Sequence, residues 1–486
     1  MQLADSLRLG PRAADARVQR GPNHLDAMRK ILILTAPLLA GLWGCSGSGG
    51  SDGGINGNPQ DAGVDAGSAL FQTTDLTIPE TAGQGAVVAA LSPDGRIGIA
   101  YYGDTSVTNR NIEYVEYDTA TGQQQHAVTI ATGYDRISDL AITWSDAGAS
   151  SSAYVAFLGN DPNVNEAIET NGGDGGVFWH QSDVSLATID SSGNLTIDYP
   201  VHNGMEATNP CGNGVDDRDS PVVGISPALA WNGNQLMIMY RNIHSGQFPI
   251  QDYGKSNMGS AIGTPGNPGT WTVLNAICGS DNGGAFVSEG IGQGTTLAVN
   301  NGIALAATSG EVDIDAIISG IYTATYEQGA WTGKQALFTN PPLATSNSVG
   351  PRIVADSQVG FGLAWADMTA SKVYYSSSTD GQTWAPYSLV FGAGTGGWYP
   401  SLAFDPNHLP AVAFYVCAKE PGVNQGNCPA EEDDLRVANF KPDGHWIQSV
   451  IDPAGGYYPT LMYNGGQMIV VYRTLAGGLR IATQVQ

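Results

Sequence analysis

A short phrase of sequence recurs along most of the chain, and it constrains the fold more than any other feature. Tyr399–Asp405 reads YPSLAFD and Tyr458–Asn464 reads YPTLMYN, and each leads through a turn into a second apolar segment. Looser copies bring the count to seven, and they span Val87–Tyr102, Ile137–Leu158, Ser226–Tyr240, Thr295–Ala307 and Pro351–Trp365. Repetition of this kind predicts a fold in which each unit packs mainly on its neighbours.

Further strands are expected between the copies, such as Leu435–Phe440 and Ile447–Ile451, which the turn KPDG joins. Two strands plus two strands make the blade of a β-propeller. We therefore predict an all-β fold: a single β-propeller of about seven four-stranded blades over residues 69–486. Six or eight blades are alternatives, because the second copy carries a long insertion between Gly159 and Val177. A two-domain β-sandwich is the other alternative.

The two ends of the repeat region predict how the ring closes. The last copy stops after a third strand, Leu479–Gln484, whereas Leu70–Ile78 precedes the first copy as a strand without a blade of its own. We expect this N-terminal strand to complete the last blade, which also removes an exposed sheet edge.

Composition agrees with this fold and excludes some partners. The 486 residues include 65 Gly and 26 Pro, as expected for many strands joined by tight turns. The formal net charge of −25 repels phosphate backbones, so we do not expect nucleic-acid binding.

The N-terminal region contains a targeting pattern. Met28-Arg29-Lys30 begins a basic segment, and the apolar run Ile31–Trp43 that follows is too short to span a bilayer. Leu42-Trp43-Gly44-Cys45 resembles the lipobox of bacterial lipoproteins. The resemblance implies a signal peptide at 28–44 after an upstream extension at 1–27. It also implies a lipid on Cys45 as the membrane anchor, and Ser46 resembles an outer-membrane signal. Residues 45–68, rich in Gly, Ser and Asp, then read as the lipidated cysteine and a disordered tether.

Four cysteines are left after Cys45, an even set that suits an oxidising compartment. The short spacing suggests a Cys417–Cys428 disulfide, which leaves Cys211 with Cys278.

One turn has a family resemblance. Ser378–Trp384 reads STDGQTW and resembles the Asp-box of sialidases and related propellers, although it is one residue short. The resemblance implies a turn between the third and fourth strands of a blade, which Asp380 caps while Trp384 packs between blades. It is a folding device and implies little about chemistry.

A propeller places ligands at the mouth of its central channel. Alignment of the seven copies puts these residues just before the shared leucine or its equivalent: Val88, Asp139, Ala228, Thr296, Arg352, Ser401 and Thr460. With the residues a few places earlier, the candidate ligand-binding residues are Arg136, Asp139, Arg352, Trp398, Tyr399, Tyr457 and Tyr458. Aromatic faces stack on sugars, whereas Asp and Arg hold hydroxyls or carboxylates. The alternative is that the aromatics belong to the core between blades and the charges form structural pairs.

A glycine-rich loop supplies a candidate metal site. Asn213, Asp216, Asp217 and Asp219 gather the oxygen ligands that Ca²⁺ prefers, although the EF-hand spacing is absent. A solvated loop is the alternative, and calcium is the only cofactor that we consider.

We therefore expect a binding or scaffolding module at the cell envelope, on the periplasmic or surface face of the outer membrane, whose ligand is a glycan or an envelope protein. The alternative is a sialidase-like glycoside hydrolase with a divergent catalytic set. Such an enzyme needs two placed carboxylates, and Asp104, Asp139 and Asp367 occupy plausible positions, but no spacing selects a pair. We expect binding rather than catalysis.

Overall fold

The structure is a computed structural model, and it describes residues 71–78, 81–106, 109–134, 138–145, 150–162, 183–202, 222–243, 256–266, 270–277, 291–311, 319–337, 350–367, 372–392, 396–417 and 433–485. These residues all belong to one compact unit, Asn58–Gln486. Their regular structure is β-strand, without an α-helix in the described ranges. Accordingly, none of the described segments is a helix that could cross a membrane.

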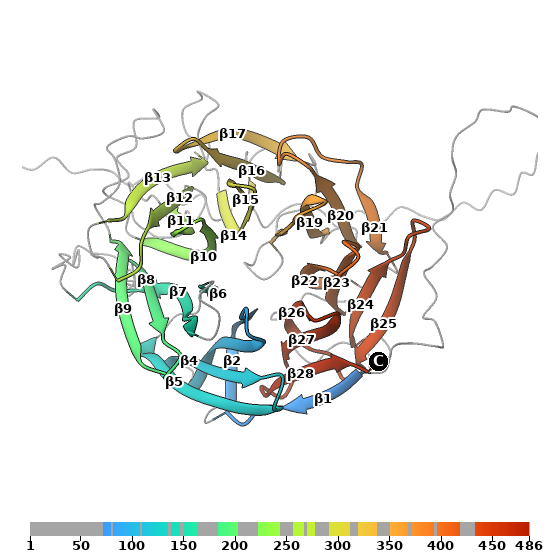
Figure 1. The fold of residues 1–486 in the computed structure, drawn as a ribbon, viewed down its shortest axis with the longest axis horizontal. Coiled ribbons are helices and arrows are strands. Elements are labelled where there is room, and N and C mark those ends of the chain that lie inside the picture. The colour runs from blue at the N-terminus through green and yellow to red at the C-terminus, as the bar shows by residue number, and fades with distance from the viewer. Residues whose placement is uncertain are drawn as a thin grey trace, which may run out of the picture. The chain divides into compact units, whose positions relative to one another are not determined.

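The strands form seven antiparallel four-stranded sheets, which surround a centre as the blades of a propeller (Figure 1). Blades 1 to 3 are β2–β5 (Thr81–Leu91, Arg96–Ser106, Asn109–Asp118, Gln123–Tyr134), β6–β9 (Ala141–Trp144, Ala153–Gly159, Asp183–Ile189, Leu195–Val201) and β10–β13 (Val222–Asn232, Gln235–Ile243, Ser256–Gly263, Thr272–Ile277). Blades 4 to 6 are β14–β17 (Ile291–Asn300, Ile303–Glu311, Ser319–Glu327, Ala330–Leu337), β18–β21 (Arg352–Asp356, Gly360–Asp367, Lys372–Ser378, Ser388–Phe391) and β22–β25 (Gly397–Phe404, Pro410–Val416, Asp434–Phe440, Trp446–Asp452). Blade 7 is β26–β28 (Tyr457–Asn464, Gln467–Arg473, Leu479–Gln484) with β1 (Phe71–Asp75). The predicted fold class and blade number are confirmed.

Strand β1 closes the ring from the other end of the chain. It pairs antiparallel with β28, from Phe71 opposite Gln484 to Asp75 opposite Arg480. Just after β1, the amide of Leu76 donates a hydrogen bond to the carbonyl of Leu479, 2.9 Å away. Figure 1 shows β1, in blue, beside β28, in red. The predicted closure is confirmed.

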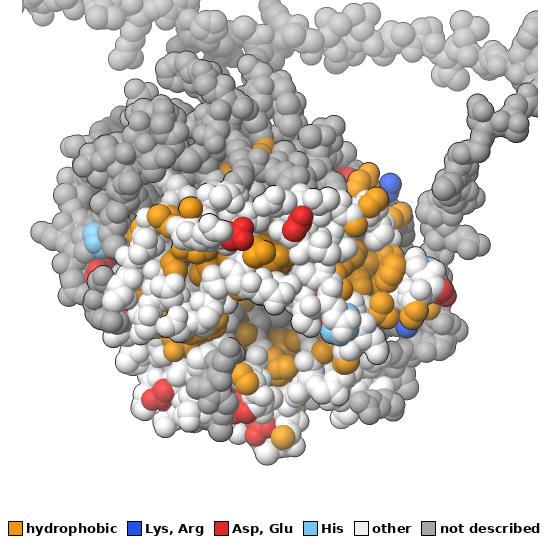
Figure 2. Space-filling view, turned by 45° about the horizontal axis from the view of Figure 1, so that its top comes forward, with side chains coloured by type: hydrophobic (Ala, Val, Ile, Leu, Met, Phe, Trp, Pro, Cys, Tyr) orange, Lys and Arg blue, Asp and Glu red, His pale blue; other side chains and the backbone are white. Residues whose placement is uncertain are grey.

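The hydrophobic core lies between blades. Each core cluster joins strands of adjacent blades; one cluster, for example, packs Ile97 and Ile99 of β3 against Ile469 and Val471 of β27. Because both faces of a blade are covered, a second strand such as β23 is buried at every residue. This explains why these segments are continuously apolar instead of alternating. Charged side chains are correspondingly few on the described surface in Figure 2.

The turn between β20 and β21 has the geometry that its resemblance implies. The carboxylate of Asp380 accepts hydrogen bonds from the amides of Gln382 (2.8 Å) and Thr383 (2.7 Å). Trp384 packs against a cluster built from blades 4 and 5. That this turn is an Asp-box like those of sialidases stays a prediction.

At one face of the ring, which we call the channel face, the innermost strand of every blade begins; these strands are β2, β6, β10, β14, β18, β22 and β26. The longest connections between strands, 160–182, 202–221, 244–255, 278–290, 338–351 and 417–433, leave and return at this face. At the opposite face the chain turns tightly, as at Asn301-Gly302 and Gly465-Gly466, where positive φ angles make two-residue turns possible. Binding residues are usually carried on the long connections of a rigid scaffold, so the channel face is the candidate functional face.

Candidate functional site: the central channel

The channel contains a cavity of about 340 Å³, and residues of all seven innermost strands or their leading segments line it. The seven aligned residues all lie on its wall: Val88, Asp139, Ala228, Thr296, Arg352, Ser401 and Thr460. A position inferred from repeat alignment therefore corresponds to one level of the channel. Apolar residues such as Leu140, Ile142 and Leu229 are numerous in the rest of the wall, but the surface exposed to the cavity is about equally polar and apolar.

The hydroxyls at this level tie neighbouring blades together. Thr296 Oγ1 of β14 accepts a hydrogen bond from the amide of Ile353 in β18, 3.1 Å away. Ser401 Oγ of β22 accepts the equivalent bond from the amide of Leu461 in β26, 2.9 Å away. Because these bonds satisfy backbone groups that the propeller buries, the two hydroxyls have a structural role.

Asp139 and Arg352 are the two ionisable residues of the cavity wall that carry opposite charge, and they come from blades 2 and 5. In the described part of the chain, no ion pair joins them. Arg352 Nη1 donates to the carbonyl of its neighbour Pro351, 3.2 Å away.

Burial controls the protonation of both groups. Desolvation raises the pKa of Asp139 to about 6, although the positive charge of Arg352 and the hydroxyl of Ser226 oppose this effect. Desolvation likewise lowers the pKa of Arg352, and the charge of Asp139 opposes it. The two groups therefore influence each other through the channel.

A β-bulge shapes the channel face of several blades. Ser226, Tyr399 and Tyr458 have φ angles of 50°, 54° and 53°, and each precedes a proline. Gly294 takes the same position in blade 4, with a φ of 58°. The ladder register shifts at each of these places. A left-handed residue before proline is costly, so its recurrence in three blades identifies a stored strain at the channel face.

Two tyrosines in this conformation line the cavity. The rings of Tyr399 and Tyr458 lie 4.4 Å apart, centroid to centroid. Burial is the main cause that raises the pKa of Tyr399 well above its usual value. Arg473, at the end of β27, places its guanidinium 5.7 Å from the ring centroid of Tyr458. The edge of the cavity at blades 6 and 7 is therefore aromatic and backed by a cation.

The structure separates the other two aromatic candidates from the channel. Trp398 and Tyr457 are buried in the core cluster of blades 6 and 7 and are not among the residues that line the cavity. Trp398 donates its indole N–H to the carbonyl of Cys417, 2.8 Å away. Tyr457 lies opposite Arg473 in the ladder and 4.8 Å beneath its guanidinium. Tyr399 and Tyr458, the residues at the bulge, also contact this core cluster, but they line the cavity as well.

Sequence reasoning missed Ser226 and Thr295. Ser226 influences Asp139, and the Thr295 hydroxyl donates to the carbonyl of Ser226, which links blades 3 and 4. A proline follows Ser226, just as one follows Tyr399 and Tyr458. This shared pattern is the signal that could have identified Ser226 from the sequence.

The remaining candidates lie outside the described residues: Arg136, Asn213, Asp216, Asp217, Asp219, Cys45, Cys211, Cys278 and Cys428. Cys417 is described, and it is buried at the end of β23. Within the described ranges, no group of three or more His, Cys, Asp or Glu side chains could hold a metal ion. The calcium loop, the lipid anchor and the disulfides stay predictions.

No family model and no curated protein matches the chain. Among solved structures, it is similar to a protein of unknown function from Dyadobacter fermentans, with 10% identity over 86% of this chain and 99% of that one and a TM-score of 0.44. It is also similar to a fungal alcohol oxidase with copper (11% identity, 86% and 76% covered, TM-score 0.49). A third similarity is to a mutant of Trypanosoma rangeli sialidase (10% identity, 86% and 60% covered, TM-score 0.40).

Proposed function

We propose that this protein is a ligand-binding module of the cell envelope, which holds a glycan or a partner protein at the channel face of its propeller. The proposal includes a lipid on Cys45 as its membrane anchor in the outer membrane, a signal peptide at 28–44 and a tether up to residue 68. The observation that carries it is the central cavity, in which Asp139 and Arg352 face a common space from blades 2 and 5.

Three features support a binding role for this cavity. Its volume lies within the range of small-molecule sites, and its wall combines polar and apolar surface in about equal parts. Tyr399 and Tyr458 add aromatic surface at its edge, of the kind that stacks on sugar rings. The longest connections of the chain return to the same face.

A sialidase-like glycoside hydrolase is the second candidate, and one observation favours it. The pKa of Asp139, raised to about 6, suits a general acid at neutral pH. Hydrolysis also needs a second carboxylate about 5 to 9.5 Å away. Asp139 is the only Asp or Glu among the described residues of the cavity wall, so the described part of the site supports binding better.

Both candidates are tested in one experiment. The body from Ala69 onward is incubated with a panel of polysaccharides and sialosides, while bound ligand and released sugar are measured separately. Binding without release that Arg352→Gln weakens supports the proposal, whereas release that Asp139→Asn abolishes supports the hydrolase. Asp443→Asn, an exposed change in the turn after β24, is the matched control. Absence of both binding and release across the panel would exclude a glycan ligand.

A further inference from the structure

The cavity holds two opposite charges that do not neutralise each other by direct contact. Asp139 and Arg352 both line it, yet within the described structure their charged groups form no ion pair at 4.0 Å or less. The hydrogen bond from Arg352 to the carbonyl of Pro351 engages one of the five N–H groups of its guanidinium. No other described residue accepts a hydrogen bond from this guanidinium, so its remaining donors can serve a ligand in the cavity.

Retaining such charges is costly. Asp139 and Arg352 are each only partly exposed at the cavity wall, so each loses part of its hydration, and a direct partner is the usual compensation for such a loss. Alignment of the blades shows what the fold itself requires at this level, because Val88, Ala228, Thr296, Ser401 and Thr460 take the equivalent places. Small or hydroxyl-bearing residues therefore satisfy the architecture, and neither charge is needed to build the ring.

The wall between the two charges restricts the ligand. The hydroxyl oxygens of Thr296 and Ser401 each accept a hydrogen bond from a backbone amide of the next blade, whereas the side chains of Leu140 and Ile353 are buried in the cores between blades. Arg352 would attract a simple anion, but Asp139 would repel it. A simple cation would be attracted by Asp139 and repelled by Arg352. A neutral ligand without hydrogen-bonding groups would desolvate both charges without compensating either.

We infer that the cavity binds a small zwitterion, with a carboxylate on Arg352, an ammonium group on Asp139 and a short aliphatic stem between the two. The inference goes beyond the proposed function, because a small zwitterion is neither a glycan nor a protein, and the two share only the channel as the binding site. Arg352 offers the planar pair of donors that matches a carboxylate, and Asp139 offers acceptors to an ammonium group.

The test uses the full chain and a series of ω-amino acids from glycine to 6-aminohexanoate, with isothermal titration calorimetry as the readout. Alkanoates and alkylamines of matched length serve as single-charge probes. We expect saturable binding at one or two chain lengths and affinity about thirtyfold or more lower for either single-charge probe. Asp139→Asn and Arg352→Gln should each weaken zwitterion binding by a similar factor.

A control variant, Lys441→Gln with Asp443→Asn, removes the same two charges from the turn between β24 and β25 and should bind as the wild type does. Because either channel variant could be partly unfolded, the ratio of zwitterion to alkanoate affinity is compared as well; it does not depend on the folded fraction. Asp139→Asn should bring that ratio close to one.

Other outcomes overturn the inference. If alkanoates bind the wild type as tightly as zwitterions do, the site is an anion site. If glycans bind in the channel and no zwitterion does, the ligand class is wrong and the proposed function stands. If neither class binds, the channel site itself is rejected.

Discussion

Arg480 and Asp75 are 405 residues apart in sequence, yet Arg480 Nε donates a hydrogen bond to Asp75 Oδ1 across 2.6 Å. The contact joins the last strand of the chain to the first one. Arg480 Nη1 also reaches Asp452 Oδ2 of β25, 2.8 Å away, so one guanidinium links blade 6, the end of blade 7 and the closing strand.

Deletion of residues 71–78 should destabilise the whole propeller. It removes the buried side chain of Leu76 and a row of hydrogen bonds to β28, which together contribute roughly 3 kcal/mol or more. Asp75→Ala should cost less than about 1 kcal/mol, because the side chain of Asp75 is 70% exposed. Urea denaturation measures both. A deletion no more costly than Asp75→Ala would show that the ring does not depend on β1.

The stability of the wild-type protein should depend on pH because of Asp139. Its folded pKa of about 6 lies above its ordinary value of 3.8, so the folded state holds this proton more tightly. Stability is therefore highest below pH 4 for this group and falls as the pH rises to about 6, by at most about 3 kcal/mol. Carboxylates with lowered pKa values, such as Asp356, act in the opposite direction. The difference between wild type and Asp139→Asn, followed by urea denaturation from pH 4 to 8, isolates the effect. Parallel profiles would contradict it.

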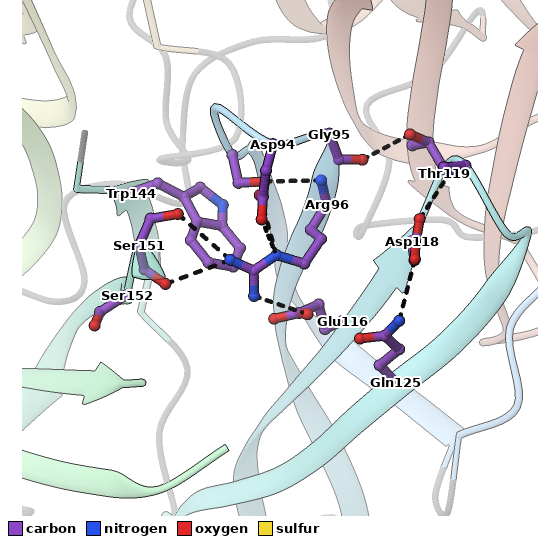
Figure 3. A network of polar contacts seen from close by, with 12 residues as sticks. Asp94, Gly95, Arg96, Glu116, Asp118, Thr119, Gln125, Trp144, Ser151 and Ser152 are labelled. Carbon is purple, nitrogen blue, oxygen red and sulfur yellow. Dashed lines mark hydrogen bonds and ion pairs between the residues drawn. The ribbon is translucent and has the colours of Figure 1, made fainter. Parts of the chain in front are cut away.

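The interface of blades 1 and 2 depends on Arg96 (Figure 3). Its guanidinium lies 4.9 Å from the ring centroid of Trp144, and it forms a 3.1 Å ion pair with Glu116, whose side chain is 1% exposed. Arg96→Met should cost roughly 3 to 5 kcal/mol, because it leaves the carboxylate of Glu116 buried without its cation. Adding Glu116→Gln should restore part of the loss, as measured by urea denaturation. A double variant as unstable as the single one would assign the loss to packing on Trp144.

Asp380→Ala should weaken the turn between β20 and β21 without changing the channel. Backbone hydrogen bonds from Thr383 and Gln382 are the largest causes of the lowered pKa of Asp380, and because the turn is exposed to solvent their loss should cost only about 0.5 to 1.5 kcal/mol. Thr379→Ala, an exposed change in the same turn, is the control. Thermal unfolding measures the effect, and equal melting temperatures for the two variants would contradict it.

Cys45→Ala should move the protein from the membrane fraction to the soluble fraction, because a lipid on this cysteine is the proposed anchor. Thr379→Ala, an exposed change far from Cys45 in the sequence, leaves the lipobox intact and should stay with the membrane. Fractionation followed by immunoblotting compares them. A Cys45→Ala protein that stays in the membrane fraction would remove the anchor from the proposal.

The blade number and the ring closure could be predicted from the sequence because each depends on local pattern. Tyr399–Asp405 and Tyr458–Asn464 have similar sequences and form the innermost strands of adjacent blades. The last copy lacks a fourth strand, which leaves one place for β1. The register of the innermost strands was predictable for the same reason, so Asp139 and Arg352 were placed at one level of the channel.

Tertiary structure alone decided which neighbouring side chain reaches the channel. Trp398 and Tyr399 look equivalent as candidates and are both buried in the core of blades 6 and 7, yet only Tyr399 also lines the cavity. The difference depends on a left-handed residue before proline, which is strained locally and persists only because the packed blades hold it. The pKa of Asp139 likewise depends on burial that blades distant in sequence create. Local pattern therefore determines the ring, and long-range packing determines what its centre can bind.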